Sequence, residues 1–117
     1  MFLLNGRPTE RVHDAMLQEA TRLESLAIDL RRIATGAAPQ PSDLVSAPVL
    51  TRWRRTSRPV PCLVGIGNGH PRIPDGPFMT TDLWAMDPAA GWGRTLGRYY
   101  TLGLSAHAYE AMRVGHD

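Results

Sequence analysis

The residues with the clearest chemical potential lie in one stretch, GIGNGHPRIPDG, at positions 65–76. A histidine oriented by a carboxylate can act as a general base, so His70 with Asp75 or Asp82 would suit a small hydrolase. A loop histidine between a glycine and a proline more commonly bonds nearby backbone, and the chain contains no Gly-x-Ser-x-Gly elbow. We therefore treat His70 and Asp75 as a possible loop site, keep a hydrolase as an alternative, and assign no catalytic residue.

The glycines of this stretch superficially resemble a phosphate-binding loop. Gly65, Gly67 and Gly69 follow an apolar run, but a dinucleotide fingerprint needs a helix that opens inside it to hold the phosphates. Pro71 and Pro74 follow instead, and no helical pattern begins for many residues. A P-loop needs a Gly-Lys pair, and the chain contains no lysine. The pattern therefore predicts a hairpin connection and no nucleotide cofactor.

Cysteine and histidine are spaced in a way that predicts neither a disulfide nor a metal site. Cys62 is the single cysteine and lies in an apolar run over residues 61–64, where we expect a small buried side chain. The four histidines show no spacing of four residues, and no cysteine pair accompanies them. We expect no metal and no cofactor.

Positive charge is concentrated in a short stretch around one tryptophan. The chain carries 13 basic residues, all arginine, and 11 acidic ones, and residues 37–60 hold four of these arginines against one aspartate. Arginine forks bind phosphates and carboxylates, and a tryptophan among them can stack on a base or anchor a protein contact. We expect a non-catalytic binding or regulatory module that contacts a nucleic acid or an acidic protein; the alternative is a solvated loop with its tryptophan buried. The residues of this predicted contact are Arg52, Trp53, Arg54, Arg55 and Arg58.

Length and hydropathy bound the class of protein. A chain of 117 residues suffices for one compact core, so we expect a single domain over residues 1–117. It contains no run of about 18 apolar residues that would span a membrane. The apolar start at residues 2–4 is too short for a signal peptide, whose core needs roughly 7–15 residues. We therefore expect a cytoplasmic protein.

A long helix is predicted over residues 9–35. Thr9 suits its start as a capping residue and Gly36 suits its end. Its apolar residues recur at spacings of three, four and seven, and Glu19 interrupts the row midway. We expect the row to pack on the sheet of the same chain; the alternative is a homodimer formed through it. The residues of the dimer alternative are Met16, Leu23, Leu26, Leu30 and Ile33.

Residues 36–60 are predicted as a hinge followed by the basic stretch. The small residues and prolines at its start favour a flexible connection. Ser42 is expected to cap a short helical turn over residues 43–45. Residues 49–55 suit either a helical turn or an extended edge.

An antiparallel sheet is predicted over residues 61–104, where the period of the apolar residues shortens. Its strands are expected at residues 63–66, 78–86 and 92–102. Asp87 and Gly91 mark the turn before the last strand. If Met86 faces Trp92 across this turn, Trp84 faces Arg94, and that pair would form a cation–π contact. Residues 105–117 are expected to form a short helix, capped by Ser105, and a tail.

The expected fold class is α+β. A long N-terminal helix would pack on a small three- or four-stranded antiparallel meander, which could curl into a partly open barrel, and a short C-terminal helix would follow. This order of elements is typical of a small domain with one layer of helix on one sheet.

A set of short motifs runs through residues 52–103. They read Trp-Arg, Pro-Cys-Leu-x-Gly, Gly-His-Pro, Asp-Gly, Gly-Trp, Arg-Thr and Tyr-x-Leu-Gly, and start at residues 53, 61, 69, 75, 91, 94 and 100. With these motifs, this half of the chain resembles a family of small alphaproteobacterial proteins known only as a domain of unknown function. The family's Thr-Ser step is Thr80-Thr81 here, a mild departure. The resemblance implies a bacterial source and no particular activity, and it does not reach the long helix.

Overall fold

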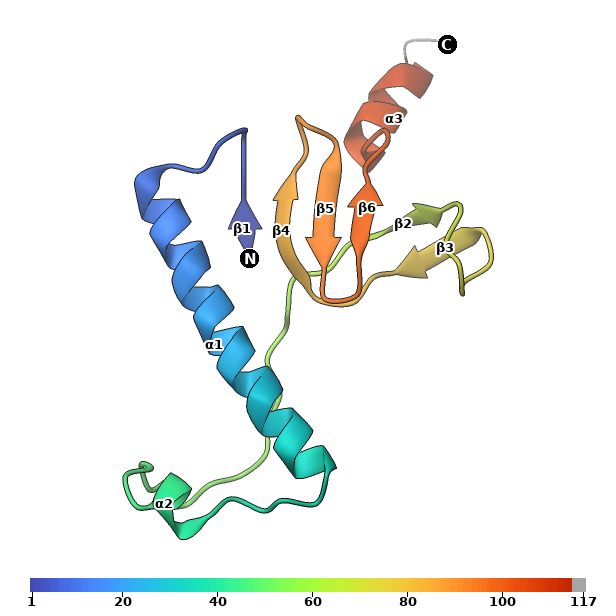
Figure 1. The fold of residues 1–117 in the computed structure, drawn as a ribbon. Coiled ribbons are helices and arrows are strands. Elements are labelled where there is room, and N and C mark those ends of the chain that lie inside the picture. Colours follow the sequence, from blue (N-terminus) through green and yellow to red (C-terminus); the bar gives the residue numbers. More distant parts are fainter. Residues whose placement is uncertain (115–117) are drawn as a thin grey trace. The chain divides into compact units, whose positions relative to one another are not determined.

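The computed structural model has the α+β class predicted from the sequence (Figure 1). It contains a long N-terminal helix, a short C-terminal helix and a mostly antiparallel sheet. The described strands do not close into a barrel. The packing of the long helix on the sheet stays a prediction.

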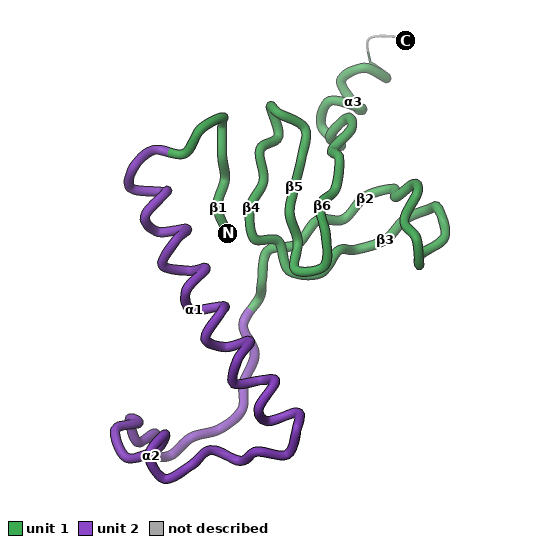
Figure 2. Tube along the Cα trace, viewed as in Figure 1, with its two compact units in different colours: residues 1–8, 59–117 green, residues 9–58 purple. Residues whose placement is uncertain are grey.

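The structure describes residues 1–114 and divides the chain into two compact units (Figure 2). Unit 1 takes in residues 1–8 and the chain from residue 59 onward, with every described strand and the last helix. Unit 2 consists of residues 9–58, with the first two helices. Residues 115–117, the end of the expected tail, lie outside the described residues.

Helix α1 (Glu10–Ala34) begins and ends where its residue types predict. The Thr9 hydroxyl accepts a hydrogen bond of 3.4 Å from the Val12 N–H. Gly36 has a φ of +87°, and its N–H donates to the carbonyl of Ile33. A left-handed residue closes a helix at little cost when it is glycine, so the end of α1 is fixed by this one position.

Helix α2 (Pro41–Leu44) is the short turn expected in the hinge, but its cap differs from the prediction. Gln40, not Ser42, precedes the first helical residue, and the Asp43 carboxylate accepts a hydrogen bond of 2.7 Å from the Gln40 N–H. The prediction was wrong because Pro41 suits the first helical position, where its missing N–H costs nothing. Ser42 therefore lies inside the turn.

The larger sheet of unit 1 has the strand order β1-β4-β5-β6. The three later strands, β4 (Leu83–Asp87), β5 (Trp92–Thr95) and β6 (Tyr99–Thr101), form the antiparallel meander that the sequence predicts. Strand β1 (Phe2–Leu3) adds a parallel edge beside β4, which was not predicted because two residues show no period. The sheet therefore has four strands and one parallel pair.

A separate two-stranded sheet is formed by β2 (Val64–Gly67) and β3 (Gly76–Met79). The single strand predicted over residues 78–86 is thus wrong: its first part belongs to this hairpin and its second part to β4. The division has a local cause, because the Thr80 hydroxyl and N–H both bond to the backbone of Leu63.

The strand predicted over residues 92–102 is likewise divided, into β5 and β6. The buried Thr95 hydroxyl accepts hydrogen bonds from the N–H groups of Gly97 and Arg98, at 3.2 and 3.3 Å. A threonine that bonds to the backbone two and three residues ahead turns the chain. The period-two pattern runs through this turn without a break, which explains the error.

The register between β4 and β5 differs by one residue from the prediction. Ala85, not Trp84, lies opposite Arg94, and Asp87 itself pairs with Trp92. An irregularity between Leu83 and Ala85 leaves Trp84 outside the ladder. The predicted Trp84–Arg94 contact is therefore wrong.

The buried residues of unit 1 lie mainly on β4 and beside it. Apolar Leu4, Leu83 and Ala85 are buried, together with Asp87 and Thr95. Helix α3 (Ala106–Val114) follows the sheet, and the Ser105 hydroxyl caps it as predicted by accepting a hydrogen bond from Ala108. Within residues 1–114, no helix combines the length and apolar character needed to cross a membrane.

Candidate functional site

The basic segment, which we define as residues 52–58, is irregular and exposed. Residues 49–58 form neither a helix nor a paired strand, so the helical turn considered from the sequence is not formed. Arg52 has a φ of +53°, which is uncommon for a residue other than glycine and bends the chain just before Trp53. The Trp53 side chain is 71% exposed, so it is not buried beneath the loop.

The four guanidinium groups of the basic segment face solvent. All four arginines are exposed. Within residues 1–114, the ion pairs shorter than 4 Å join Arg22 to Glu19, Arg113 to Glu110 and His13 to Asp14. The segment therefore presents exposed cationic forks beside an exposed indole, which is the chemistry that binds phosphates or carboxylates and stacks on a flat ring.

The loop between β2 and β3 is the hairpin connection predicted from its glycines and prolines. Gly67 pairs with Gly76 at its base. Inside the loop, the Asp75 carboxylate accepts a hydrogen bond of 3.0 Å from the Gly69 N–H. The His70 Nδ1 accepts hydrogen bonds from the N–H groups of Arg72 and Ile73, at 3.0 and 3.1 Å. Both predicted loop residues thus bind the loop's own backbone.

The His70 ring also packs in an aromatic cluster. It lies 6.0 Å from the Phe78 ring on β3 and 6.4 Å from the Tyr100 ring on β6, and these two rings are 6.0 Å apart. The cluster joins the two sheets of unit 1. Desolvation, followed by the positive charges of Arg98 and Arg72, lowers the pKa of His70. The neutral ring is therefore favoured, as its acceptor role at Nδ1 requires.

No catalytic pair is assembled around His70 in the part of the chain that the structure describes. Its Nδ1 and the Asp75 carboxylate each bind backbone, and the carbonyl of Asp82 accepts the Leu96 N–H. Within residues 1–114, no hydrogen bond joins the His70 ring to either carboxylate, and no group of three or more His, Cys, Asp or Glu side chains is arranged to hold a metal ion.

Cys62 is exposed, so the prediction of a buried thiol is wrong. Strand β2 begins only at Val64, and the residue before it, Leu63, is the half-buried one of this run. An apolar run that begins at a proline and reaches the strand only at its last residue does not bury every side chain.

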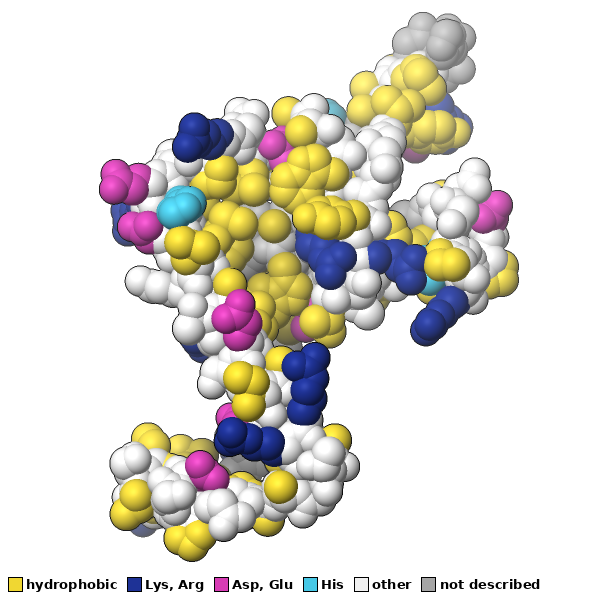
Figure 3. Space-filling view, in the orientation of Figure 1, with side chains coloured by type: hydrophobic (Ala, Val, Ile, Leu, Met, Phe, Trp, Pro, Cys, Tyr) yellow, Lys and Arg dark blue, Asp and Glu magenta, His cyan; other side chains and the backbone are white. Residues whose placement is uncertain are grey.

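A second cluster of arginine and aromatic rings lies on β5 and β6. The Arg94 guanidinium carbon lies 5.1 Å from the centre of the Tyr99 ring, and the Trp92 ring stands edge-on to Tyr99 at 6.1 Å. Tyr99 is 69% exposed. Hydrophobic side chains gather over β4 to β6 with basic ones at their border (Figure 3). The sequence pattern pointed to Arg94 but to the wrong ring, because the register was shifted.

The row of α1 residues expected in a homodimer is not buried. Met16 is half-buried, and the four others are exposed, from 36% at Leu23 to 57% at Ile33; Leu26 and Leu30 lie between these values.

Comparison with known proteins supports the resemblance seen in the sequence. A model described as "Family of unknown function (DUF6634)" matches residues 24–115. This match is wider than residues 52–103 and includes the C-terminal part of α1. Neither a curated protein nor a solved structure matches the chain.

Proposed function

The chain belongs to the family of unknown function DUF6634, and within it we propose a non-catalytic binding module that contacts a nucleic acid or an acidic protein through the basic segment. The observation that carries this proposal is the exposure of Trp53, at 71%, among four exposed arginines. An indole held in solvent costs hydrophobic free energy, so a partner that covers it regains that free energy on binding.

A nucleic acid is the partner that this chemistry favours. Phosphates bind guanidinium forks and an exposed indole stacks on any base, so a single strand can engage both features at once; an acidic protein would bind the forks but would need a pocket for the indole. The Arg94, Tyr99 and Trp92 cluster offers the same chemistry in unit 1. A nucleic-acid partner also fits a cytoplasmic protein, which is the location expected from the sequence.

Fluorescence anisotropy with labelled oligonucleotides tests this proposal. Single-stranded DNA, single-stranded RNA and duplex DNA are titrated at two salt concentrations with the wild type and with a triple variant, Arg52→Glu, Arg54→Glu and Arg55→Glu. Each phosphate contact contributes about 0.7 to the salt slope for a single strand and about 0.9 for a duplex, so loss of three contacts should lower the slope by about 2 for a single strand and about 3 for a duplex.

A matched variant separates this contact from net charge. Arg7, Arg11 and Arg113 are exposed arginines outside the basic segment, and their reversal to Glu changes the total charge by the same amount. This control variant should lower the affinity for the oligonucleotides much less than the triple variant of the basic segment does. Equal losses in the two variants would point to unspecific attraction. If low salt brings no binding of any oligonucleotide but an acidic peptide binds, the partner is a protein.

The hydrolase alternative receives no support from the site geometry, because Nδ1 of His70 and the carboxylate of Asp75 bind loop backbone. We therefore do not propose an enzymatic activity.

A further inference from the structure

The apolar row of α1 is a second surface, one that the basic-segment proposal does not use. No residue of this helix is buried, although large apolar side chains recur along it. Met16, Leu23 and Leu30 follow one another at seven-residue spacing, and so do Glu19, Leu26 and Ile33. These two series are the core positions of a helix pair, with Glu19 as one polar interruption.

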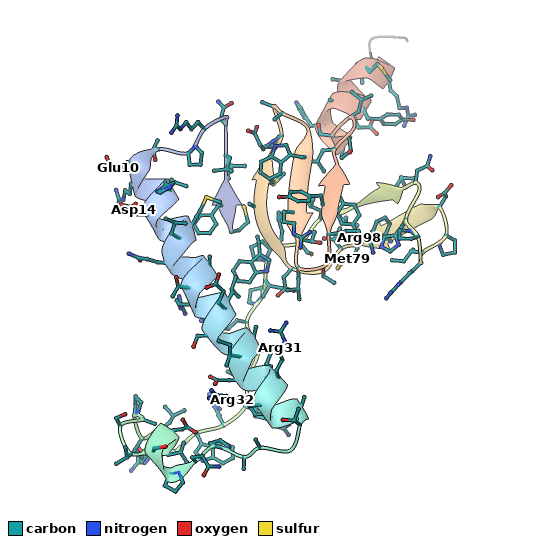
Figure 4. All side chains as sticks on the ribbon, viewed as in Figure 1. Glu10, Asp14, Arg31, Arg32, Met79 and Arg98 are labelled. Atoms are coloured by element: carbon teal, nitrogen blue, oxygen red, sulfur yellow. The ribbon has the colours of Figure 1, made fainter. Side chains whose placement is uncertain are left out.

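The charges along α1 indicate how a second copy of the helix could pair with this row. Figure 4 shows Glu10 and Asp14 toward the start of the helix and Arg31 and Arg32 toward its end. All four lie on the face of the helix away from the row, so the orientation depends on Glu19, which a parallel second copy would place opposite its own Glu19. An antiparallel copy keeps the two Glu19 carboxylates apart and aligns the two helix dipoles favourably.

One antiparallel register satisfies both the apolar and the charged residues. With Leu23 opposite Leu26 of the second copy, Met16 lies opposite its Ile33. In the same register Arg22 lies beside Asp29 of the second copy, and by symmetry Asp29 lies beside Arg22 of the second copy. A shift by one heptad would bring Arg22 against Arg22 instead. We propose that α1 pairs with α1 of a second copy of this chain, antiparallel and in this register.

Glu19 is compatible with this pair because of its place in the helix. Its carboxylate lies 3.2 Å from the Arg22 guanidinium of the same helix. It would face the apolar Leu30 of the second copy rather than another carboxylate, and Arg22 of its own helix would neutralise it. Pairing through α1 involves no residue of the basic segment, so each can be tested without the other.

Disulfide trapping tests orientation and register together. In a Cys62→Ser background, which removes the exposed native thiol, Met16→Cys and Ile33→Cys are made as separate proteins and mixed under mild oxidation. These positions are 17 residues, or about 25 Å, apart along the helix, far beyond disulfide reach. The antiparallel pair predicts a mixed disulfide of Met16→Cys with Ile33→Cys. Disulfides within each protein alone, or none, would overturn the proposal.

Analytical ultracentrifugation of charge variants tests the same register without cysteine. Arg22→Glu alone should weaken dimerisation about two- to fivefold, and adding Asp29→Arg should restore the part of this loss that comes from the pair between the two copies. Glu24→Arg, on the outer face, is the control and should leave the dissociation constant unchanged. Leu23→Glu should weaken it by at least about tenfold while circular dichroism retains the helix. A wild type that stays monomeric at every concentration would also overturn the proposal.

Discussion

The Asp87 carboxylate, at 2% exposure, accepts a hydrogen bond of 2.7 Å from the backbone N–H of Gly6, 81 positions earlier in the chain. Its other oxygen accepts one of 3.0 Å from the Ala90 N–H. One side chain therefore fastens the segment after β1 to the turn between β4 and β5. The hydrogen bond from Gly6, followed by that from Ala90, holds the pKa of Asp87 below its ordinary value of 3.8.

We expect Asp87 to make unit 1 sensitive to acid. Because its folded pKa lies below 3.8, its stabilisation is complete above that pH and is lost as the pH falls through the folded pKa. Asp87→Asn should lower the melting temperature near neutral pH, and the difference from the wild type should narrow in acid. Thermal melts across this range measure the effect. Asp14→Asn, at an exposed position, is the control; a difference for Asp87→Asn that did not change with pH would contradict the account.

His70 should add a second pH dependence nearer neutrality. Its pKa lies below the ordinary value of 6.5, chiefly through desolvation, so the folded state resists protonation more than the unfolded state. The contribution of His70 to the free energy of unfolding is then complete above pH 6.5, and it is lost as the pH falls through the pKa of the folded state. His70→Asn keeps an acceptor for the loop N–H groups but does not titrate. It should flatten the melting temperature between mildly acidic and neutral pH; an unchanged profile would show that His70 is not responsible.

The sequence predicted the elements whose signals are local. Thr9 and Gly36 bounded α1 correctly, and the turn residues Asp87 and Gly91 placed the β4–β5 hairpin. The errors came from long-range pairing. Strand β1 forms only by pairing with β4, more than 80 residues away in the chain. The strands predicted over residues 78–86 and 92–102 show no break in their alternating pattern at Thr80 and Thr95, where the chain turns.

For the candidate site too, the sequence showed the local features but not the long-range contacts. The arginines around Trp53 were found from composition alone, because a charge cluster needs no contact to be recognised. The aromatic partners of His70 and Arg94 could not be found, since Phe78, Tyr100 and Tyr99 meet them only once the register is known.

The aromatic cluster leaves no room for a side chain at Gly67. A Cβ built there would overlap the Phe78 ring. Gly67→Ala should therefore displace Phe78, and with it the His70 and Tyr100 rings, at a cost of about 1–3 kcal/mol. Chemical denaturation followed by far-UV circular dichroism measures the loss.

Gly65 in the same strand is the matched control for Gly67. A Cβ at this position meets no atom within 4 Å, and no left-handed backbone is needed. Gly65→Ala should stay within about 0.5 kcal/mol of the wild type. Similar losses at both positions would mean that strand β2 tolerates no side chain and that the Phe78 contact is not the cause.

Trp53 should separate binding from stability. Its side chain is 71% exposed, so Trp53→Ala should leave the denaturation midpoint nearly unchanged. Stacking on one base is worth about 1–3 kcal/mol, so affinity for a single strand should fall about 5- to 150-fold, whereas Trp53→Phe retains part of the stacking and should lose less. The salt slope should stay that of the wild type, because no phosphate contact is removed. Loss of affinity with a reduced slope would show that Trp53 instead positions the neighbouring arginines, and unchanged affinity would remove it from the contact.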